Sequence, residues 1–312
     1  MLDFSNSKIL IVGDVMLDKY YFGKVDCISP EAPVPIVNIQ KEESRLGGAS
    51  NVANNIVSLG GHSLLCGVIG HDLFGKEIER ISRHKNIDTF LLKTSSPTIT
   101  KARIIGGKQQ IVRVDYEDKS ELNADNKKLF RDTISRILPE YDILVISDYG
   151  KGLISEDLCR YLIKLAHKYD KKVIIDPKGK NWEKYSGADI VTPNVKELSD
   201  IVGYTVPNTD RAIEKAAREA ITNNHLTALL VTRSDKGMSL IGPIPPIHIP
   251  THSEEVFDVS GAGDTVVATL GLCLAAGFEI SEAMRTANIA AGIVVKKVGT
   301  ATLTIEELVQ QK

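Results

Sequence analysis

Short, unbroken apolar runs recur along the chain, and amphipathic stretches separate them. Such runs predict strands that are covered on both faces, because a strand with one solvent-facing side would alternate with polar residues. The amphipathic stretches predict helices. Strands alternating with helices are typical of an α/β protein in which a mostly parallel sheet lies between two helical layers. The strands are expected at 8–12, 64–69, 142–147, 172–175, 189–192 and 228–232, and the helices at 124–137, 155–168, from about 195, at 281–297 and from 304.

Two pairs of strand-like segments interrupt this alternation, and no helical stretch joins the members of either pair. The first pair is separated by Ser29-Pro30-Glu31-Ala32-Pro33, which breaks regular structure, and the second is joined around Gly106-Gly107. We therefore expect a small β-sheet lid, formed by about 18–42 and 97–117, that folds over a site on the main sheet. The four lid strands are expected at 20–25, 34–39, 98–103 and 110–115.

The remaining linkers are short, so we expect a single domain across residues 1–312. Segments 238–241 and 244–249 should extend the main sheet in the antiparallel sense, because the proline and glycine between them leave no room for a helix.

Composition and charge exclude several classes of protein. Hydrophobic residues make up 43% of the chain and charged residues 25%, which is ordinary for a globular protein. The net charge of −2 gives no field that favours nucleic acid or an anionic membrane. The first residues lack a secretion signal, no apolar run reaches the ~18 residues of a membrane span, and the four cysteines form no C-x-x-C pair. We expect a cytoplasmic protein that binds neither nucleic acid nor membrane.

The segment Asp258-Val259-Ser260-Gly261-Ala262-Gly263-Asp264 places a glycine-rich turn between two acids, directly before an apolar helical stretch. The free N–H groups of such a turn lie at the positive end of the helix dipole and suit an anion such as phosphate. A carboxylate there is repelled by the phosphate, so we infer that Asp264 takes the proton from an attacking hydroxyl, with Gly261, Ala262 and Gly263 forming the turn. The alternative is an ordinary helix with an acidic first turn.

Polar residues follow the ends of several predicted strands. Asp14 and Asp18, after the first strand, are candidates for binding hydroxyls. Gly47 and Gly48 permit a tight turn and close approach of a ligand, and Asn51, in a helix running to about Leu59, can both donate to and accept from a sugar hydroxyl. Because the carboxyl ends of parallel strands meet at one edge of the sheet, these residues together indicate a site. Further polar loops follow strands at 147–152, 176–179 and 192–197.

Two other motifs are incomplete. Residues 70–77 nearly spell the P-loop pattern, but Glu77 stands where the magnesium-binding hydroxyl belongs, so we interpret Lys76 as a solvated helix residue. A dinucleotide fingerprint needs G-x-G-x-x-G directly after a strand, and Gly261-Ala262-Gly263 lacks the third glycine. A non-catalytic sugar or nucleotide sensor on the same fold is a further alternative. A sensor can lose its catalytic base, but Asp264 and Glu197 are both present.

Four motifs in order resemble those of the ribokinase-like (PfkB) carbohydrate kinases over nearly the whole chain. They are Gly13-Asp14, Gly47-Gly48-x-x-Asn51, Asn194-x-x-Glu197 and Asp258-x-x-Gly261-Ala262-Gly263-Asp264. The family usually has threonine at the position of Ser260. The resemblance implies a three-layer α/β/α ribokinase-like fold with a β lid, and a kinase that uses ATP and Mg²⁺.

Within the family, the chain is most similar to the D-glycero-β-D-manno-heptose 7-phosphate kinases. This resemblance implies transfer from ATP to the anomeric hydroxyl of the heptose 7-phosphate, giving the 1,7-bisphosphate used for the lipopolysaccharide core. A fructokinase, ribokinase or adenosine kinase is the alternative. Some relatives add a nucleotidyltransferase domain; no H-x-G-H signature occurs here, so we expect a kinase alone or a kinase half. The similar segments are 13–18, 28–35, 147–152 and 176–178.

The resemblance also implies roles for individual residues. Asp264 would be the base, and Asp14, Gly48 and Asn51 would hold sugar hydroxyls. Glu197 would orient the Mg²⁺ shell through water, and Asp258 with carbonyls near Gly299 would bind K⁺. The nucleotide would contact Asn194, Val195, Lys196, Glu197, Thr232, Ser234, Gly237, Gly261, Gly263 and Asn288.

Two expectations concern the lid. A phosphate already on the sugar needs cationic partners, for which Arg103, Arg113 and Lys178 are candidates, whereas Lys101 and Lys108 are interpreted as surface charges. The lid strands also carry apolar residues that a small sheet cannot bury on both faces, among them Tyr20, Phe22, Ile36 and Ile111. We therefore expect a homodimer in which two lids pack together.

Overall fold

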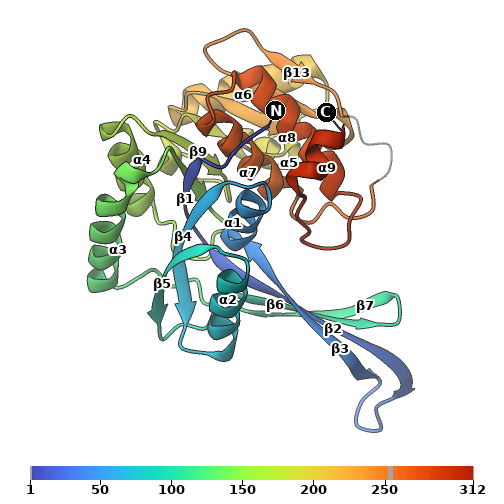
Figure 1. Ribbon diagram of the computed structural model, residues 1–312. Helices are drawn as coiled ribbons and strands as arrows, with labels where there is room; N and C mark the ends of the chain where they lie inside the picture. The colour runs from blue at the N-terminus through green and yellow to red at the C-terminus, as the bar shows by residue number, and fades with distance from the viewer. Residues whose placement is uncertain (1, 252–255, 312) are drawn as a thin grey trace.

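A nine-stranded sheet forms the centre of the structure, a computed structural model that describes residues 2–251 and 256–311 (Figure 1). In sheet order the described strands are β13 (Ile247–Ile249), β12 (Met238–Ile241), β11 (Leu229–Thr232), β10 (Ile190–Val191), β9 (Lys172–Asp176), β8 (Ile143–Ser147), β1 (Lys8–Gly13), β4 (His62–Gly70) and β5 (Asp88–Thr94). All neighbours from β11 to β5 are parallel, and β12 and β13 are added antiparallel. The predicted mostly parallel sheet is confirmed.

Helices cover both faces of this sheet. Alternate residues of β1 divide between two apolar cores: Ile9 and Ile11 pack with one set of helices, and Leu10 and Val12 pack with the other. The first set includes α1 (Ala49–Ser58), α7 (Ala262–Ala275), α8 (Ile280–Val294) and α9 (Ile305–Gln311), and the second includes α3 (Ala124–Ile137), α4 (Glu156–Lys168), α5 (Val195–Val202) and α6 (Asp210–Asn224). The predicted three-layer α/β/α architecture is therefore confirmed.

A four-stranded sheet, here called the lid sheet, extends away from this body (Figure 1). Its order is β3-β2-β6-β7, with β2 parallel to β6 and the outer pairs antiparallel. The first two strands are longer than expected, because their residues nearest the body are buried and continue the pairing. The strands are β2 (Val15–Ile28), β3 (Pro35–Gly48), β6 (Thr100–Gly106) and β7 (Gln109–Tyr116).

Some elements differ from expectation. The edge strand β5 and the helix α6 were not expected, because the first is half-exposed and the second is rich in charge. β13 begins only at Ile247, since the prolines before it cannot pair. Helix α2 (Leu73–His84) begins after Asp72, which accepts from the N–H of Gly75 at 2.8 Å, and Lys76 lies exposed on it as expected. None of the helices in the described ranges has the length and apolar character that a bilayer crossing requires.

Candidate active site

The ends of three neighbouring strands bring the predicted polar loops together. The N–H of Asp14, after β1, donates to the carbonyl of Ser147 at 3.1 Å, and the N–H of Asp148 donates to the carbonyl of Asp176 at 3.1 Å. A Cβ at Gly13 would lie 2.3 Å from the Ser147 carbonyl oxygen, so glycine is required for this approach. The loops after β1, β8 and β9 therefore lie side by side at one edge of the sheet.

Asp264 lies in the first turn of α7 with its side chain buried. The helix begins after Gly261, whose φ of 80° is in the left-handed region that favours glycine. The Asp264 Oδ2 accepts from Asn51 Nδ2 at 2.8 Å, and its Oδ1 accepts from the Tyr149 hydroxyl at 2.7 Å. Helix α1 and the loop after β8 thus hold this carboxylate at the positive end of α7.

Burial perturbs the two central carboxyl groups. It raises the pKa of Asp264 to about 6, against the opposing effect of the hydrogen bonds from Asn51 and Tyr149. Burial and the nearby charge of Asp148 raise the pKa of Asp14 to about 6. Such values leave a carboxylate ionised at neutral pH yet close to the range that suits a proton acceptor.

The predicted sugar-side residues lie around Asp264. Asp14 accepts through Oδ2 from the N–H of Tyr149 at 2.8 Å and of Lys151 at 3.1 Å. Gly48 has a φ of 55°, and a Cβ there would lie 2.6 Å from the Asp14 carbonyl oxygen. Asn51 differs from expectation in one respect, because its amide N–H already bonds to Asp264. This hydrogen bond holds the Asp264 carboxylate in place, and the role of Asn51 in binding a sugar hydroxyl stays a prediction.

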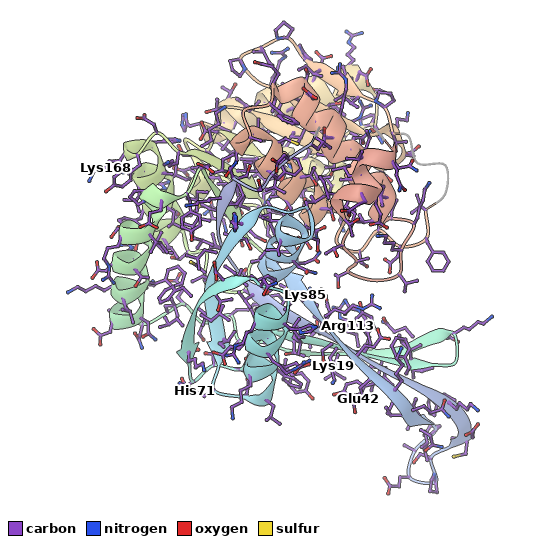
Figure 2. All side chains as sticks on the ribbon, in the orientation of Figure 1. Lys19, Glu42, His71, Lys85, Arg113 and Lys168 are labelled. Atoms are coloured by element: carbon purple, nitrogen blue, oxygen red, sulfur yellow. The ribbon has the colours of Figure 1, made fainter. Side chains whose placement is uncertain are left out.

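The candidate cations are dispersed. Arg103 pairs with Asp18 at 2.6 Å, and Arg113, labelled in Figure 2, pairs with Asp115 at 2.7 Å; the two arginines face each other across β6 and β7. Lys178 instead pairs with Glu197 at 3.0 Å. Lys178 therefore lies beside the first turn of α5, where Glu197 is, and none of these ion pairs joins it to the lid arginines.

Lys101 is the cation that the sequence did not reveal. Its side chain is half-buried on β6, and its Nζ lies 5.5 Å from the centroid of the Tyr149 ring. Within residues 2–251 and 256–311, no carboxylate lies at salt-bridge distance from it. Burial lowers its pKa against the opposing charge of Asp18, and the charges of Lys151, Arg103 and Arg113 act in the same direction as burial. Its interpretation as a solvated surface charge was wrong.

The Asn194-x-x-Glu197 motif forms the start of α5. Asn194 accepts from the N–H of Glu197 at 2.8 Å, and Glu197 Oε2 accepts from the N–H of Asn194 at 3.1 Å, a reciprocal capping box. Val195 and Lys196 lie in the first turn, where helix N–H groups are free for phosphate. The motif therefore stabilises the start of α5 through these two hydrogen bonds, whether or not a nucleotide is bound.

The remaining predicted nucleotide residues border the next strands. Thr232 ends β11 and bridges to Asn194. Ser234 has an unusual positive φ of 56° in the turn before β12. Gly237 is required there, since a Cβ would lie 2.0 Å from the Ile249 carbonyl oxygen. Asn288, on α8, donates to the Pro250 carbonyl at 2.7 Å.

The predicted monovalent-cation residues also lie together. Asp258 accepts from the N–H of Ser260 at 2.9 Å and of Gly299 at 2.8 Å, which joins the turn before α7 to the turn after α8. The carbonyl of Val298 in that second turn already accepts from Arg45 Nη1 at 2.5 Å. Carboxylate and carbonyl oxygens are the ligands that hard cations prefer, which is consistent with the predicted K⁺ site. K⁺ binding itself stays a prediction.

A cavity of about 600 Å³ adjoins Asp14 on the side facing β4 and β5. Its lining includes three carboxyl groups, from Asp14, Asp118 and Glu121, and two lysines, Lys93 and Lys151, together with hydroxyl, amide and apolar groups. Lys93 pairs with Glu79 at 2.9 Å and Lys151 pairs with Glu117, so the cavity holds little unpaired positive charge. It suits an uncharged polar group better than a phosphate.

Comparison with solved structures defines the fold class. Phosphofructokinase-2 from Escherichia coli in complex with potassium superimposes with a TM-score of 0.81 at 20% identity, covering 98% of this chain and 97% of that chain. Arabidopsis thaliana ribokinase complexed with ribose and ATP gives 0.76 at 19% identity, covering 98% of both. The fold is therefore ribokinase-like, as expected.

The sequence identifies the family. The model of the pfkB family carbohydrate kinases matches residues 6–307, and the chain belongs to that family. It is 46% identical over 308 residues to the bifunctional protein HldE of Haemophilus influenzae (strain PittEE), and 46% identical over 304 residues to that of Chromohalobacter salexigens. It covers 63% of the length of each of these relatives.

Proposed function

We propose that this chain is an ATP-dependent sugar kinase whose acceptor is the anomeric hydroxyl of D-glycero-β-D-manno-heptose 7-phosphate and whose product is the 1,7-bisphosphate. The observation that carries the kinase proposal is the Asp264 carboxylate, buried at the N-terminus of α7 and held by two hydrogen bonds. Family membership and the similarity to the HldE proteins support the class of substrate. A fructokinase-like activity is the alternative.

In this proposal each group of residues in the site has one role in phosphoryl transfer. Asp14 orients the sugar ring, and Asp264 removes the proton from the attacking hydroxyl. The N–H groups of Gly261 to Asp264, at the positive end of α7, stabilise the charge on the transferring phosphoryl group. The loops from Asn194 to Glu197 and from Thr232 to Gly237 form the nucleotide side.

Magnesium is the group that such a reaction implies, and the oxygen ligands here fit it. Glu197 Oε1 accepts from the ammonium of Lys178 at 3.0 Å. Burial, with the nearby charges of Asp264 and Glu197, raises the pKa of the Asp176 carboxyl group well above its ordinary value. Both groups supply hard oxygen atoms, and we propose that Glu197 holds the ion through water. When bound, Mg²⁺ neutralises charge on the nucleotide phosphates.

The phosphate already on the sugar is proposed to bind Lys101. Replacing Lys101 by Ala should raise KM for the heptose 7-phosphate by about 10-fold or more, because a charge-assisted contact to phosphate is lost. KM for ATP should stay within about twofold. Lys108→Ala, which removes an exposed lysine from the turn between β6 and β7, is the matched control and should change neither constant.

Steady-state kinetics with each substrate varied in turn give both constants. Equal sugar KM values in wild type and Lys101→Ala, or a preference for an unphosphorylated hexose, would favour the fructokinase-like alternative.

The lid sheet is proposed to pair with that of a second chain. The outer strand of this sheet, β7, is exposed along its whole length. Across the four strands of the lid sheet, the exposed apolar residues include Val25, Ile28, Ile36 and Val112. Replacing Val112, which is 45% exposed, by Asp should convert a dimer into a monomer at micromolar concentration, because a charge would be buried at the interface. Val309→Asp on α9, at a site 50% exposed, is the control. Sedimentation analysis that finds wild-type monomers would contradict the proposal.

A further inference from the structure

Tyr149 is bonded to both carboxylates of the proposed site. Its backbone N–H donates to Asp14 Oδ2 at 2.8 Å, and its phenol O–H donates to Asp264 Oδ1 at 2.7 Å. Its ring lies beneath the ammonium of Lys101. The sequence placed this tyrosine in the polar loop 147–152 but gave it no role of its own, because its two partners are far from each other along the chain.

The loop after β8 fixes the position of Tyr149. The preceding strand is buried throughout, and Asp148 accepts from the N–H of Gly150 at 2.7 Å. Asp148 is itself held by Lys184 and by the Tyr185 hydroxyl. Gly150 and Gly152 have φ values of 66° and 106°, which turn the chain back after the tyrosine. The phenol therefore projects toward α7 from a backbone with little freedom to move.

We propose that Tyr149 is a positioning residue for phosphoryl transfer: its hydroxyl keeps the Asp264 carboxylate ionised and correctly directed, and its backbone sets Asp14 at a fixed place relative to that base. The inference rests on the proposed function, in which Asp264 accepts the proton. It assigns the tyrosine no contact with the transferred group.

The surroundings of Asp264 explain why a second donor matters. Asp18 acts from β2 to raise the pKa of Asp264, and Asp176, at the end of β9, is a further acid whose charge interacts with it. Lys101 on β6 acts in the opposite direction. Two hydrogen bonds oppose burial directly, from Asn51 and from Tyr149. Burial and the neighbouring acids raise the pKa of Tyr149 well above its ordinary value, so the phenol stays a donor near neutral pH.

The test is the pH dependence of kcat/KM for the sugar. In wild type, activity should be lost as the pH falls through about 6, because a protonated Asp264 cannot accept a proton. Tyr149→Phe removes one donor to the ionised carboxylate, so the same limb should move up by about one pH unit. Tyr204→Phe removes a tyrosine hydroxyl that bonds to Glu219, outside this network, and its limb should stay at the wild-type pH.

A limb that does not move in a folded Tyr149→Phe protein would overturn the inference. If that variant does not fold, 3-fluorotyrosine at position 149 decides the question, because it keeps the shape and donates a stronger hydrogen bond. Its limb should move to lower pH, and an unmoved limb would again overturn the inference. A failure of the proposed function gives a different result from a failure of this inference. If Asp264 is not the base, Asp264→Asn stays active, whatever the pH profile of the Tyr149 variants.

Discussion

Asp264→Asn abolishes phosphoryl transfer while nucleotide binding is retained: this is the largest effect that the structure predicts. The amide has nearly the shape of the carboxylate but cannot accept the proton of an attacking hydroxyl. A positioned general base contributes about 10²–10⁴-fold, so kcat should fall by that factor. The N–H groups at the start of α7 are unchanged, and ATP affinity should therefore change little.

The control is Asp132→Asn, the same change on the exposed side of α3. Coupled-assay kcat values and calorimetric ATP binding separate the two effects. An Asp264→Asn enzyme within a few-fold of wild-type kcat would remove Asp264 from the role of base.

Gly261→Ala should lower kcat nearly as much as Asp264→Asn does, by displacing the groups of the site without removing any of them. Residue 261 has a φ of 80°, and a Cβ there would lie 2.8 Å from Asn51 Nδ2, the atom that donates to Asp264. Either the Asn51 amide or the first turn of α7 must shift, which misplaces the base. Because a displacement of about 1 Å at a reacting group can cost roughly 10²-fold, kcat should fall by about that factor.

Gly277→Ala is the matched control at the other end of the same helix. Its φ of 82° imposes the same backbone strain on alanine, but no atom lies within 4 Å of the added Cβ. Both variants should lose about 1–2 kcal/mol of stability, and only Gly261→Ala should lose activity. Thermal unfolding and kcat are the measurements. Equal kcat values in the two variants would show that the contact with Asn51 does not matter.

The sequence predicted what depends on local pattern. Unbroken apolar runs such as 143–147 are buried strands, and the loops after β1, β8 and β9 meet because parallel strands share one edge. The turn before Asp264 was likewise predicted from its glycines, and Gly261 is left-handed as such a turn needs.

The remaining features depend on partners that are distant in sequence. Lys178 was predicted beside a sugar phosphate, yet its ammonium faces Glu197, which only the adjacency of β9 and β10 brings near. Lys101 looked like any surface lysine, and its place over the Tyr149 ring, with no acidic partner among the residues that the structure describes, appears only once β6 is paired in the lid sheet. Tyr149 is similar, since its hydroxyl meets a carboxylate 115 positions along the chain.

The measurement that tests the central claim most directly is the product formed from ATP and D-glycero-β-D-manno-heptose 7-phosphate. Incubation with Mg²⁺, followed by phosphorus NMR, reports where the new phosphate is attached. The proposal predicts a second phosphate whose signal couples to the anomeric proton, together with one ADP per sugar, and product formation at least about 10²-fold slower with Asp264→Asn. A lack of ADP formation with this sugar, or a new phosphate on another carbon, would contradict it.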